Sequence, residues 1–443
     1  MVRIAPFHGV FYNQKKFRDL ARVVSPPYDV ISPDEQEKLY RKSPHNFVRL
    51  DFHREPDSYA AVAELFANWQ AEGIFERDKQ PAIYFAVHKF ALKNGEIKER
   101  QGFYALTQLQ DFPSDEIRPH EKTLEAPKQD RLQLMLASHA QLSSIFALYS
   151  QPKGSINRIL SEQIEGNEAF LEVKLDDGDG CRLWRITDPA LIREIQRQMK
   201  EQRLVIADGH HRYEATLRYR DRMRSDRSST GRESFNYIMT HFANINDESV
   251  VILPTHRLVR GYEPKAFLQL EETLETYFYI EQYPKTSEGK SSFLRALKSS
   301  GKKHRVIGAS FKRDPRYLIL RLKNKRIMQR LAKDLSAPLR DLEVSTLHHL
   351  ILEHILGLSP EQQTSGETIR YSQDEEAVLQ ALEKEDYQAA FLLNATKSAD
   401  ILTIVDSGEM MPQKSTYFYP KLISGLVINK IDPSEEVPEP ADP

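Results

Sequence analysis

The chain has 443 residues, of which 40% are hydrophobic, so it is long enough to bury two or three ordinary cores, and a disordered chain is excluded. Lys and Arg number 62 against 64 Asp and Glu, which gives a formal net charge of -2 and no overall field for nucleic acid or an anionic membrane. A single cysteine, Cys181, excludes an internal disulfide framework and a cysteine cluster for zinc, and favours a reducing compartment.

The N-terminus does not resemble a secretory signal, because a proline and a histidine interrupt its first apolar stretch. No uninterrupted apolar run of about 18 residues, the length that a membrane-spanning helix needs, occurs in the sequence. We therefore expect a soluble, cytoplasmic protein that does not bind a membrane.

The first part of the chain mixes strands with helices. Short alternating segments such as residues 4–12 predict strands, whereas apolar positions three and four apart predict a helix at 57–72. Residues 83–92 and 102–112 predict an antiparallel hairpin, because the Asn-Gly dipeptide at 94–95 readily takes the positive φ values of a tight turn. The predicted fold class is therefore α/β in the mixed α+β sense.

Two further strands, at 142–150 and 170–177, come before a helix at 187–202. Thr187 or Asp188 is expected to cap this helix, with Pro189 in its first turn.

A group of five polar residues follows, Asp208-Gly209-His210-His211-Arg212. It lies between a short buried-type strand and an amphipathic helix, so Asp208 and Gly209 are predicted at a strand-to-helix turn. A helix start offers backbone N–H groups with partial positive charge, and Gly209 lets a ligand approach the backbone, so the turn favours an anion. Arg212 adds a planar fork that suits a pair of phosphate oxygens.

The acid and the histidines of this group leave alternatives open. Asp208 can cap the helix, but beside a phosphate its carboxylate is repulsive unless a cation such as Mg²⁺ bridges the two. His210 and His211 point about 100° apart on a helix, so at most one faces a ligand squarely, as a phosphate donor or an acid/base group. The structural alternative is a capping Asp208, surface histidines and an Arg212 that pairs with a nearby acid.

The second part of the chain begins near residue 256 and differs from the first in its predicted elements and its distribution of charge. Helices are predicted at 263–278 and 342–358, and strands at 389–395 and 422–431. The expected domains are a nucleotide-binding domain at 1–255, an α/β portion at 256–431 that contributes to the site, and a disordered tail, rich in proline and acid, at 432–443.

Two other features of the second part bear on function. Residues 302–330 carry eleven Lys or Arg and one acid, Asp314, but a strand-like stretch within them and the scarcity of glycine-aromatic motifs favour a solvated face over nucleic-acid binding. His348, His349 and His354 lack the spacing of four residues that stacks a metal-binding pair on a helix, so they are interpreted as packing or surface residues.

Four motifs together are typical of one family. SPPYDVIS at 25–32, RPHEKT at 118–123, ADGHHRYEA at 207–215 and MPQKSTYFYPK at 411–421 closely resemble the domain-of-unknown-function 1015 family. This resemblance spans nearly the whole chain. It implies a ParB/sulfiredoxin-like nucleotide-binding domain and similarity to free-serine kinases, which phosphorylate an amino-acid hydroxyl.

The resemblance also implies roles for individual residues. Phosphate or nucleotide would be bound by Gly209, His210, His211, Arg212, Lys122 and Thr123, with Asp208 placing Mg²⁺. Kinase relatives use an acid as the base toward the substrate hydroxyl, and we nominate Asp29 or Glu121, with His120 beside the latter. Substrate contact or closure of the site would come from Asn46, Arg49, Gln413, Lys414, Ser415 and Thr416.

The sequence thus predicts a nucleotide-dependent phosphotransferase that acts on a small hydroxyl-bearing metabolite, for example free serine, with ATP or ADP and Mg²⁺ as cofactors. No P-loop motif is present. The alternative is a ParB-like nucleotide-binding regulatory or scaffold protein, although no helix-turn-helix is evident. Hydrolysis by a metal at Asp208, His210 and His211 is disfavoured, because neighbouring side chains at a helix start splay apart. The sequence predicts no oligomeric state.

Overall fold

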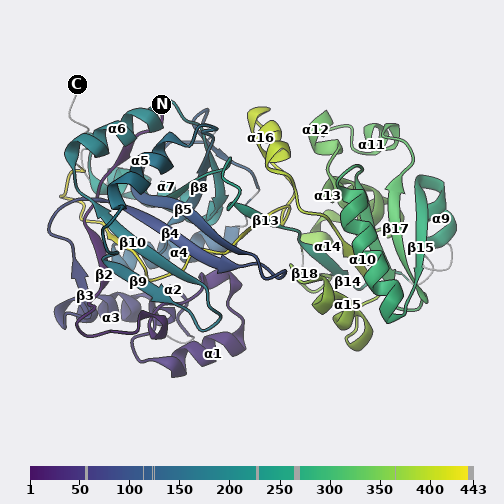
Figure 1. The fold of residues 1–443 in the computed structure, drawn as a ribbon, viewed down its shortest axis with the longest axis horizontal. Helices are drawn as coiled ribbons and strands as arrows, with labels where there is room; N and C mark the ends of the chain where they lie inside the picture. Colours follow the sequence, from purple (N-terminus) through teal and green to yellow (C-terminus); the bar gives the residue numbers. More distant parts are fainter. Residues whose placement is uncertain are drawn as a thin grey trace. The chain divides into compact units, whose positions relative to one another are not determined.

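A computed structural model describes residues 1–437 except 55–57, 113, 122, 124, 226–228, 264–269 and 365. The chain forms two compact units (Figure 1). The first unit contains Met1–Pro119, Thr123–Val251 and the chain from Pro420 onward, and the second contains His120–Lys122 and Ile252–Tyr419. Helices and strands occur together in both units, which confirms the predicted mixed α/β class.

The first unit is built on a nine-stranded sheet, in the order β6-β11-β8-β12-β5-β4-β10-β9 with β1 paired to β5. Most neighbours are antiparallel, but β11 is parallel to β6 and β12 to β8. The strands are β1 (Ile4–Ala5), β4 (Ile83–Ala91), β5 (Ile97–Gln108), β6 (Ile117–Pro119), β8 (Ile145–Tyr149), β9 (Leu171–Lys174), β10 (Gly180–Ile186), β11 (Leu204–Asp208) and β12 (Tyr237–Asn244).

Both faces of the sheet are buried along β8 and most of β4 and β11, which explains why these strands are largely apolar. Along β4, Ile83 and Phe85 enter one core while Tyr84 and Ala86 enter the other, as the two-residue period of a strand requires. The predicted hairpin is confirmed, since β4 pairs with β5 and Gly95 has a φ of 83° in the turn between them.

Helices cover both faces of the sheet (Figure 1). On one face lie α5 and α6, and on the other lies α3. Asp188 caps α6, as one of the two predicted alternatives had it. The helices of this unit are α1 (Pro33–Lys42), α2 (Val48–Asp51), α3 (Tyr59–Ala71), α4 (Glu125–Ser138), α5 (Ser155–Ile164), α6 (Pro189–Lys200), α7 (His210–Ser225) and the 3-10 turns η1 (Leu20–Arg22), η2 (Tyr28–Val30) and η3 (Ser234–Asn236).

A small second sheet of the first unit joins distant parts of the sequence, in the order β3-β2-β21-β7. Its strands are β2 (Gly9–Tyr12), β3 (Phe75–Arg77), β7 (Ala140–Gln141) and β21 (Ile428–Lys430). Residues 431–437, which follow β21, are attached to the same unit, because Val437 is buried and donates its N–H to the carbonyl of Arg232 at 2.8 Å.

The second unit contains a six-stranded antiparallel sheet, in the order β15-β17-β16-β19-β14-β18. The helices α10 and α15 pack on one face of it. The strands are β13 (Val251–Leu253), at the boundary between the units, and β14 (His256–Val259), β15 (Phe278–Pro284), β16 (Val306–Phe311), β17 (Arg316–Leu322), β18 (Ile369–Ser372), β19 (Ala389–Leu392) and β20 (Tyr417–Tyr419).

The predicted helix at 263–278 is helical at 270–277, and residues 264–269 lie outside the described residues. The predicted helix at 342–358 is a short α-helix followed by a ten-residue π-helix, a form that apolar periodicity does not distinguish from an α-helix. The helices are α9 (Leu270–Tyr277), α10 (Ser287–Gly301), α11 (Arg326–Leu331), α12 (Ala337–Arg340), α13 (Glu343–Ser345), η4 (Thr346–Ile355), α14 (Pro360–Thr364), α15 (Glu375–Lys384) and α16 (Ser398–Asp406). Among the described residues, no helix combines the length and apolarity needed to cross a membrane.

Candidate functional site

The polar turn lies between β11 and α7 in the first unit. β11 ends at Asp208 and α7 begins at His210, so Gly209 is the junction, and its carbonyl accepts from the N–H of Tyr213 at 2.9 Å. Gly209 has a φ of +87°, a conformation that side chains of other residues disfavour. A Cβ here would also lie 3.0 Å from Nε of Arg212 and from Ile145. Glycine is therefore required on both counts.

Two cations flank the carboxylate of Asp208. Nη2 of Arg212 donates to Oδ2 at 2.5 Å, and Nζ of Lys421 donates to Oδ1. Burial alone would raise the pKa of the Asp208 carboxyl, but the charges of Lys421 and Arg212 overcome this effect and hold its pKa well below the usual range. With one carboxylate between two cations, the turn keeps a surplus of positive charge.

Arg212 is 9% exposed and its guanidinium is already engaged. Besides the bond to Asp208, Nη1 donates to the carbonyl of Ser144. Arg212 is therefore held in place by the turn and by the loop before β8. Only the N–H groups that these two bonds do not use remain for a ligand.

The residues present do not form a protein-only metal site. Both oxygens of Asp208 are paired with cations, and no group of three or more His, Cys, Asp or Glu suited to a metal ion occurs among the described residues. A divalent ion would have to displace Lys421 or Arg212 to reach Asp208.

A second charged group adjoins the turn. Asp51 accepts from Nη1 of Arg131 at 3.0 Å and from the hydroxyls of Ser143 at 2.8 Å and Ser424 at 3.2 Å. The guanidinium of Arg131 lies 4.0 Å from the ring centre of Tyr28. Burial raises the pKa of Tyr28 to about 12. These groups form a network of polar contacts beside the turn.

A small recess adjoins Arg212. It is lined by Tyr104, Ser143, Ser144 and Asp208, and its volume of about 10 Å³ corresponds to roughly one water molecule. The hydroxyl of Tyr104 is buried and has no hydrogen-bond partner among the described residues. The recess thus offers a donor to one small ligand group and is too small for a whole nucleotide.

Behind Tyr104 lies a fully buried polar cluster inside the sheet. Nη2 of Arg100 and Nδ1 of His88 are 3.2 Å apart, and the ring of His241 packs edge-on against that of Tyr104 at 4.7 Å. Burial, with the charge of Arg100, lowers the pKa of His88 to about 3, and burial likewise lowers the pKa of His241 well below its usual value. Both imidazoles are therefore neutral.

Six other predicted residues also belong to the first unit. Asp29 is exposed in η2, beside Tyr28. Thr123 donates to Oε1 of Glu214 on α7 at 2.6 Å. His210 and His211 are half-buried at the start of α7, and the charge of His210 contributes to lowering the pKa of Asp208.

Asn46 and Arg49 are bonded to their own surroundings. The amide of Asn46 is completely buried and donates to the carbonyls of Arg22 and Val24 at 2.9 and 3.0 Å. Nη2 of Arg49 donates to the carbonyl of Tyr40 at 2.8 Å. These bonds hold loops together, which is a structural role and not contact with a substrate.

The remaining predicted residues lie in the second unit. Nε2 of His120 is 2.7 Å from the hydroxyl of Thr416, and Glu121 forms an isolated bridge with Met411. The carbonyl of Lys414 accepts from Arg257 at 2.9 Å, and that of Ser415 accepts from Thr396 at 2.8 Å. Gln413 lies in the same loop, and Lys122 lies outside the described residues.

The motif at 411–421 predicts polar residues near the site, but it does not predict that Lys421 pairs with Asp208. Lys421, which pairs with Asp208, is 213 residues away from it. Ser143 and Ser144 form a polar pair directly before a buried strand, a signal that could have been used. Tyr104 carries no such signal, because it occupies an ordinary inward position of a strand.

The fold and the charged turn define a mixed α/β protein with a positively charged site after a strand of its main sheet. The chain belongs to the family described as Protein of unknown function (DUF1015), whose model matches residues 4–345. No curated protein matches the chain.

Several solved structures are similar to the chain. A conserved hypothetical protein from Pyrococcus furiosus is 12% identical, with a TM-score of 0.32, and the match covers 70% of this chain and 89% of that one. A free serine kinase in complex with AMP is 11% identical, with a TM-score of 0.33 and coverages of 69% and 84%. SbnI with a C-terminal truncation, from Staphylococcus aureus, is 12% identical, with a TM-score of 0.32 and coverages of 72% and 85%. Likeness at this level does not transfer an activity.

Proposed function

We propose that the protein is a nucleotide-dependent phosphotransferase, a kinase-type enzyme that acts on a small hydroxyl-bearing metabolite. The observation that carries the proposal is the pairing of one carboxylate, Asp208, with two cations, Arg212 and Lys421, at the start of a 16-residue helix. The surplus positive charge and the positive end of the helix dipole both favour a phosphate group at this turn.

Asp208 acts as an internal counter-ion in this proposal. It holds Arg212 and Lys421 side by side before the nucleotide arrives, so that the phosphate meets a cation pair that needs little rearrangement. Gly209 keeps the backbone uncovered, and the unpartnered hydroxyl of Tyr104 supplies one further donor. The rest of the nucleotide binds outside the small recess.

Asp29 is the proposed general base. Its carboxylate is exposed and makes no ion pair with the described residues, so it is available to a substrate hydroxyl. The hydroxyl oxygen forms a bond to the terminal phosphorus, the bond from that phosphorus to the bridging oxygen breaks, and the nucleotide leaves with the electron pair. The hydroxyl proton passes to Asp29. Glu121 and His120 are the other candidates for this role.

Binding of nucleotide is the first test. The full chain is titrated with ATP, ADP, CTP and GTP, with and without Mg²⁺, and thermal stabilisation is measured. We expect at least one nucleotide to stabilise the protein, and Arg212→Gln to remove this effect. Arg218→Gln is the matched control, because Arg218 lies on the same helix and pairs with Glu125 away from the turn. Undiminished stabilisation of the Arg212 variant would contradict the proposal.

Transfer of phosphate is the second test. The protein is incubated with labelled nucleotide and free serine, then with pooled amino acids and sugars, and labelled products are separated. Free serine comes first because the four sequence motifs resemble a family that is similar to free-serine kinases. We expect Asp29→Asn to abolish turnover without loss of nucleotide binding. The same assay on Glu121→Gln tests the alternative base. Stabilisation by nucleotide with no turnover for any acceptor would favour a ParB-like regulatory protein instead.

A further inference from the structure

The second unit contains a cavity of about 740 Å³ that plays no part in the function proposed above. All its lining residues belong to this unit, from Phe278 to Thr403. A volume between about 300 and 1,000 Å³ is typical of small-molecule sites. The cavity is therefore large enough to hold a metabolite, in contrast to the recess beside Asp208.

The floor of the cavity is apolar and comes from the six-stranded sheet. Ile307 on β16 lies opposite Leu320 on β17, and Phe278 on β15 lies opposite Leu322 on β17. Their neighbours Val306 and Ile319 enter the core under α10 and α15 on the other face, so the strand period directs this row toward the cavity. Such a floor suits the carbon skeleton of a ligand.

The walls of the cavity are basic. Its three acids are already bonded to other groups. Asp341 pairs with Lys325 at 2.5 Å, Asp400 pairs with Arg305 at 2.9 Å, and buried Glu343 accepts from the N–H groups of Val306 and Asn394 at 3.1 and 2.8 Å. Six cationic residues line the same space: Lys303, Arg305, Arg321, Lys325, Arg340 and Lys397.

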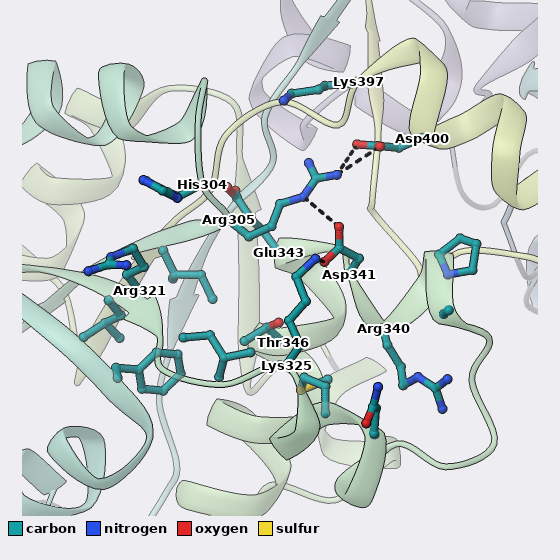
Figure 2. A pocket seen from close by; sticks show the side chains of 18 of the residues that line it. His304, Arg305, Arg321, Lys325, Arg340, Asp341, Glu343, Thr346, Lys397 and Asp400 are labelled. Carbon is teal, nitrogen blue, oxygen red and sulfur yellow. Dashed lines mark hydrogen bonds and ion pairs between the residues drawn. The ribbon is translucent and has the colours of Figure 1, made fainter.

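Three of these cations are not neutralised. Lys303, Arg340 and Lys397 have no ion-pair partner among the described residues, whereas the guanidinium of Arg321 lies 4.7 Å from the ring centre of Tyr279. Figure 2 shows Arg305 between Asp341 and Asp400, with Lys397 on one side of this group and Arg340 on the other. The cavity thus carries uncompensated positive charge at separate positions, which suits a ligand with more than one anionic group.

We propose that this cavity binds a small molecule that carries at least two phosphate groups, with its phosphates against Lys397 and Arg340 and its carbon skeleton on the apolar floor. Four of the six cations come from the basic segment at 302–330 that sequence reasoning interpreted as a solvated face. A concave site with an apolar floor selects a small ligand over nucleic acid, which needs an extended basic surface.

The test uses the full chain and calorimetric titration with inorganic pyrophosphate, ADP and fructose 1,6-bisphosphate, with adenosine as an uncharged comparison. The cavity variant combines Arg340→Gln with Lys397→Gln. Its control combines Lys302→Gln with Arg313→Gln, which removes the same charge from exposed positions outside the cavity. We expect at least one phosphorylated probe to bind, and its affinity to fall about tenfold or more in the cavity variant and to change little in the control.

Hydrogen exchange locates the bound probe and separates this site from the turn at Gly209. We expect protection in peptides that cover 303–307, 320–325 and 397–403, and the same protection in the Arg212→Gln protein. Three results would overturn the proposal: no binding of any phosphorylated probe, equal affinity in the two double variants, or protection confined to the Gly209 turn. The proposal would also be overturned if the binding of a single-stranded oligonucleotide depended on Arg340 and Lys397 more strongly than the binding of the small probes does.

Discussion

Asp208 determines the charge of the turn in the first unit. Its carboxylate faces Lys421 on one oxygen and Arg212 on the other, and only 14% of its side chain is exposed. In the free protein this carboxylate compensates the charges of two cations that water reaches poorly, as a bound phosphate would in the complex.

Replacing Asp208 by Asn removes this compensation while keeping the size of the side chain. We expect the free energy of unfolding to fall by about 3 kcal/mol, because breaking a largely buried ion pair leaves an uncompensated charge. Pyrophosphate should recover more stability in the variant than in the natural protein, since an added anion replaces the lost one. Urea unfolding with and without pyrophosphate measures both effects.

Asp221→Asn is the control for this experiment, because Asp221 lies on the same helix but has a side chain that is 61% exposed. It should change stability little and should not alter the effect of pyrophosphate. If pyrophosphate stabilises the Asp208 variant no more than the natural protein, the turn is not an anion site.

The strand-to-helix turn as an element depends on Gly209. Its φ of +87° is nearly the same as the +83° of Gly95, but a Cβ at 95 meets no atom within 4 Å, whereas at 209 it would press on Arg212 and Ile145. The two glycines therefore share the backbone requirement and differ in their surroundings.

Alanine at each position separates these two effects. Gly95→Ala should cost about 1 kcal/mol of unfolding free energy, the penalty of a positive φ for a residue with a Cβ. Gly209→Ala should cost clearly more and should also abolish nucleotide stabilisation, because the guanidinium of Arg212 has to move. Thermal unfolding of both variants, with and without nucleotide, checks this; equal losses would show that the close approach of Arg212 is unimportant.

Elements with a strong local signal could be predicted from the sequence. The Asn-Gly turn between β4 and β5 and the Asp188 cap of α6 both follow from short-range chemistry. The π-helix η4 could not, because its apolar residues follow a helical pattern without specifying which backbone carbonyl each N–H reaches.

At the scale of the whole molecule, the chain leaves the first unit after Val251 and returns to it at Pro420. The returning segment supplies Lys421 to the turn, Ser424 to Asp51 and strand β21 to the small sheet. The sequence predicted the turn itself, since strand, glycine and helix are adjacent. It did not predict the partner of Asp208, because no local pattern relates two residues that far apart.

Both units also contain neutral histidines, the buried His88 in the first and the half-buried His348 in the second, and these make the stability of the units depend on pH. Burial, with the charge of Arg100, lowers the pKa of His88 in the first unit to about 3, and burial, with the charge of Arg257, lowers that of His348 in the second unit to about 3. In the unfolded chain these groups titrate near 6.5. Above that pH neither state is protonated and the histidines have no effect. Below it only the unfolded chain takes up protons, so acid favours unfolding.

We therefore expect the free energy of unfolding to fall by about 1 kcal/mol for each such histidine between pH 7.5 and 5.5. This window separates the histidines from Asp208, whose lowered pKa adds stability that is lost only at more acidic pH. Urea unfolding at the two pH values measures the change. His348→Gln should reduce the pH dependence, whereas His304→Gln, which removes an exposed imidazole, should leave it unchanged. If the two variants keep the same pH dependence, His348 is not the group that resists protonation in the folded second unit.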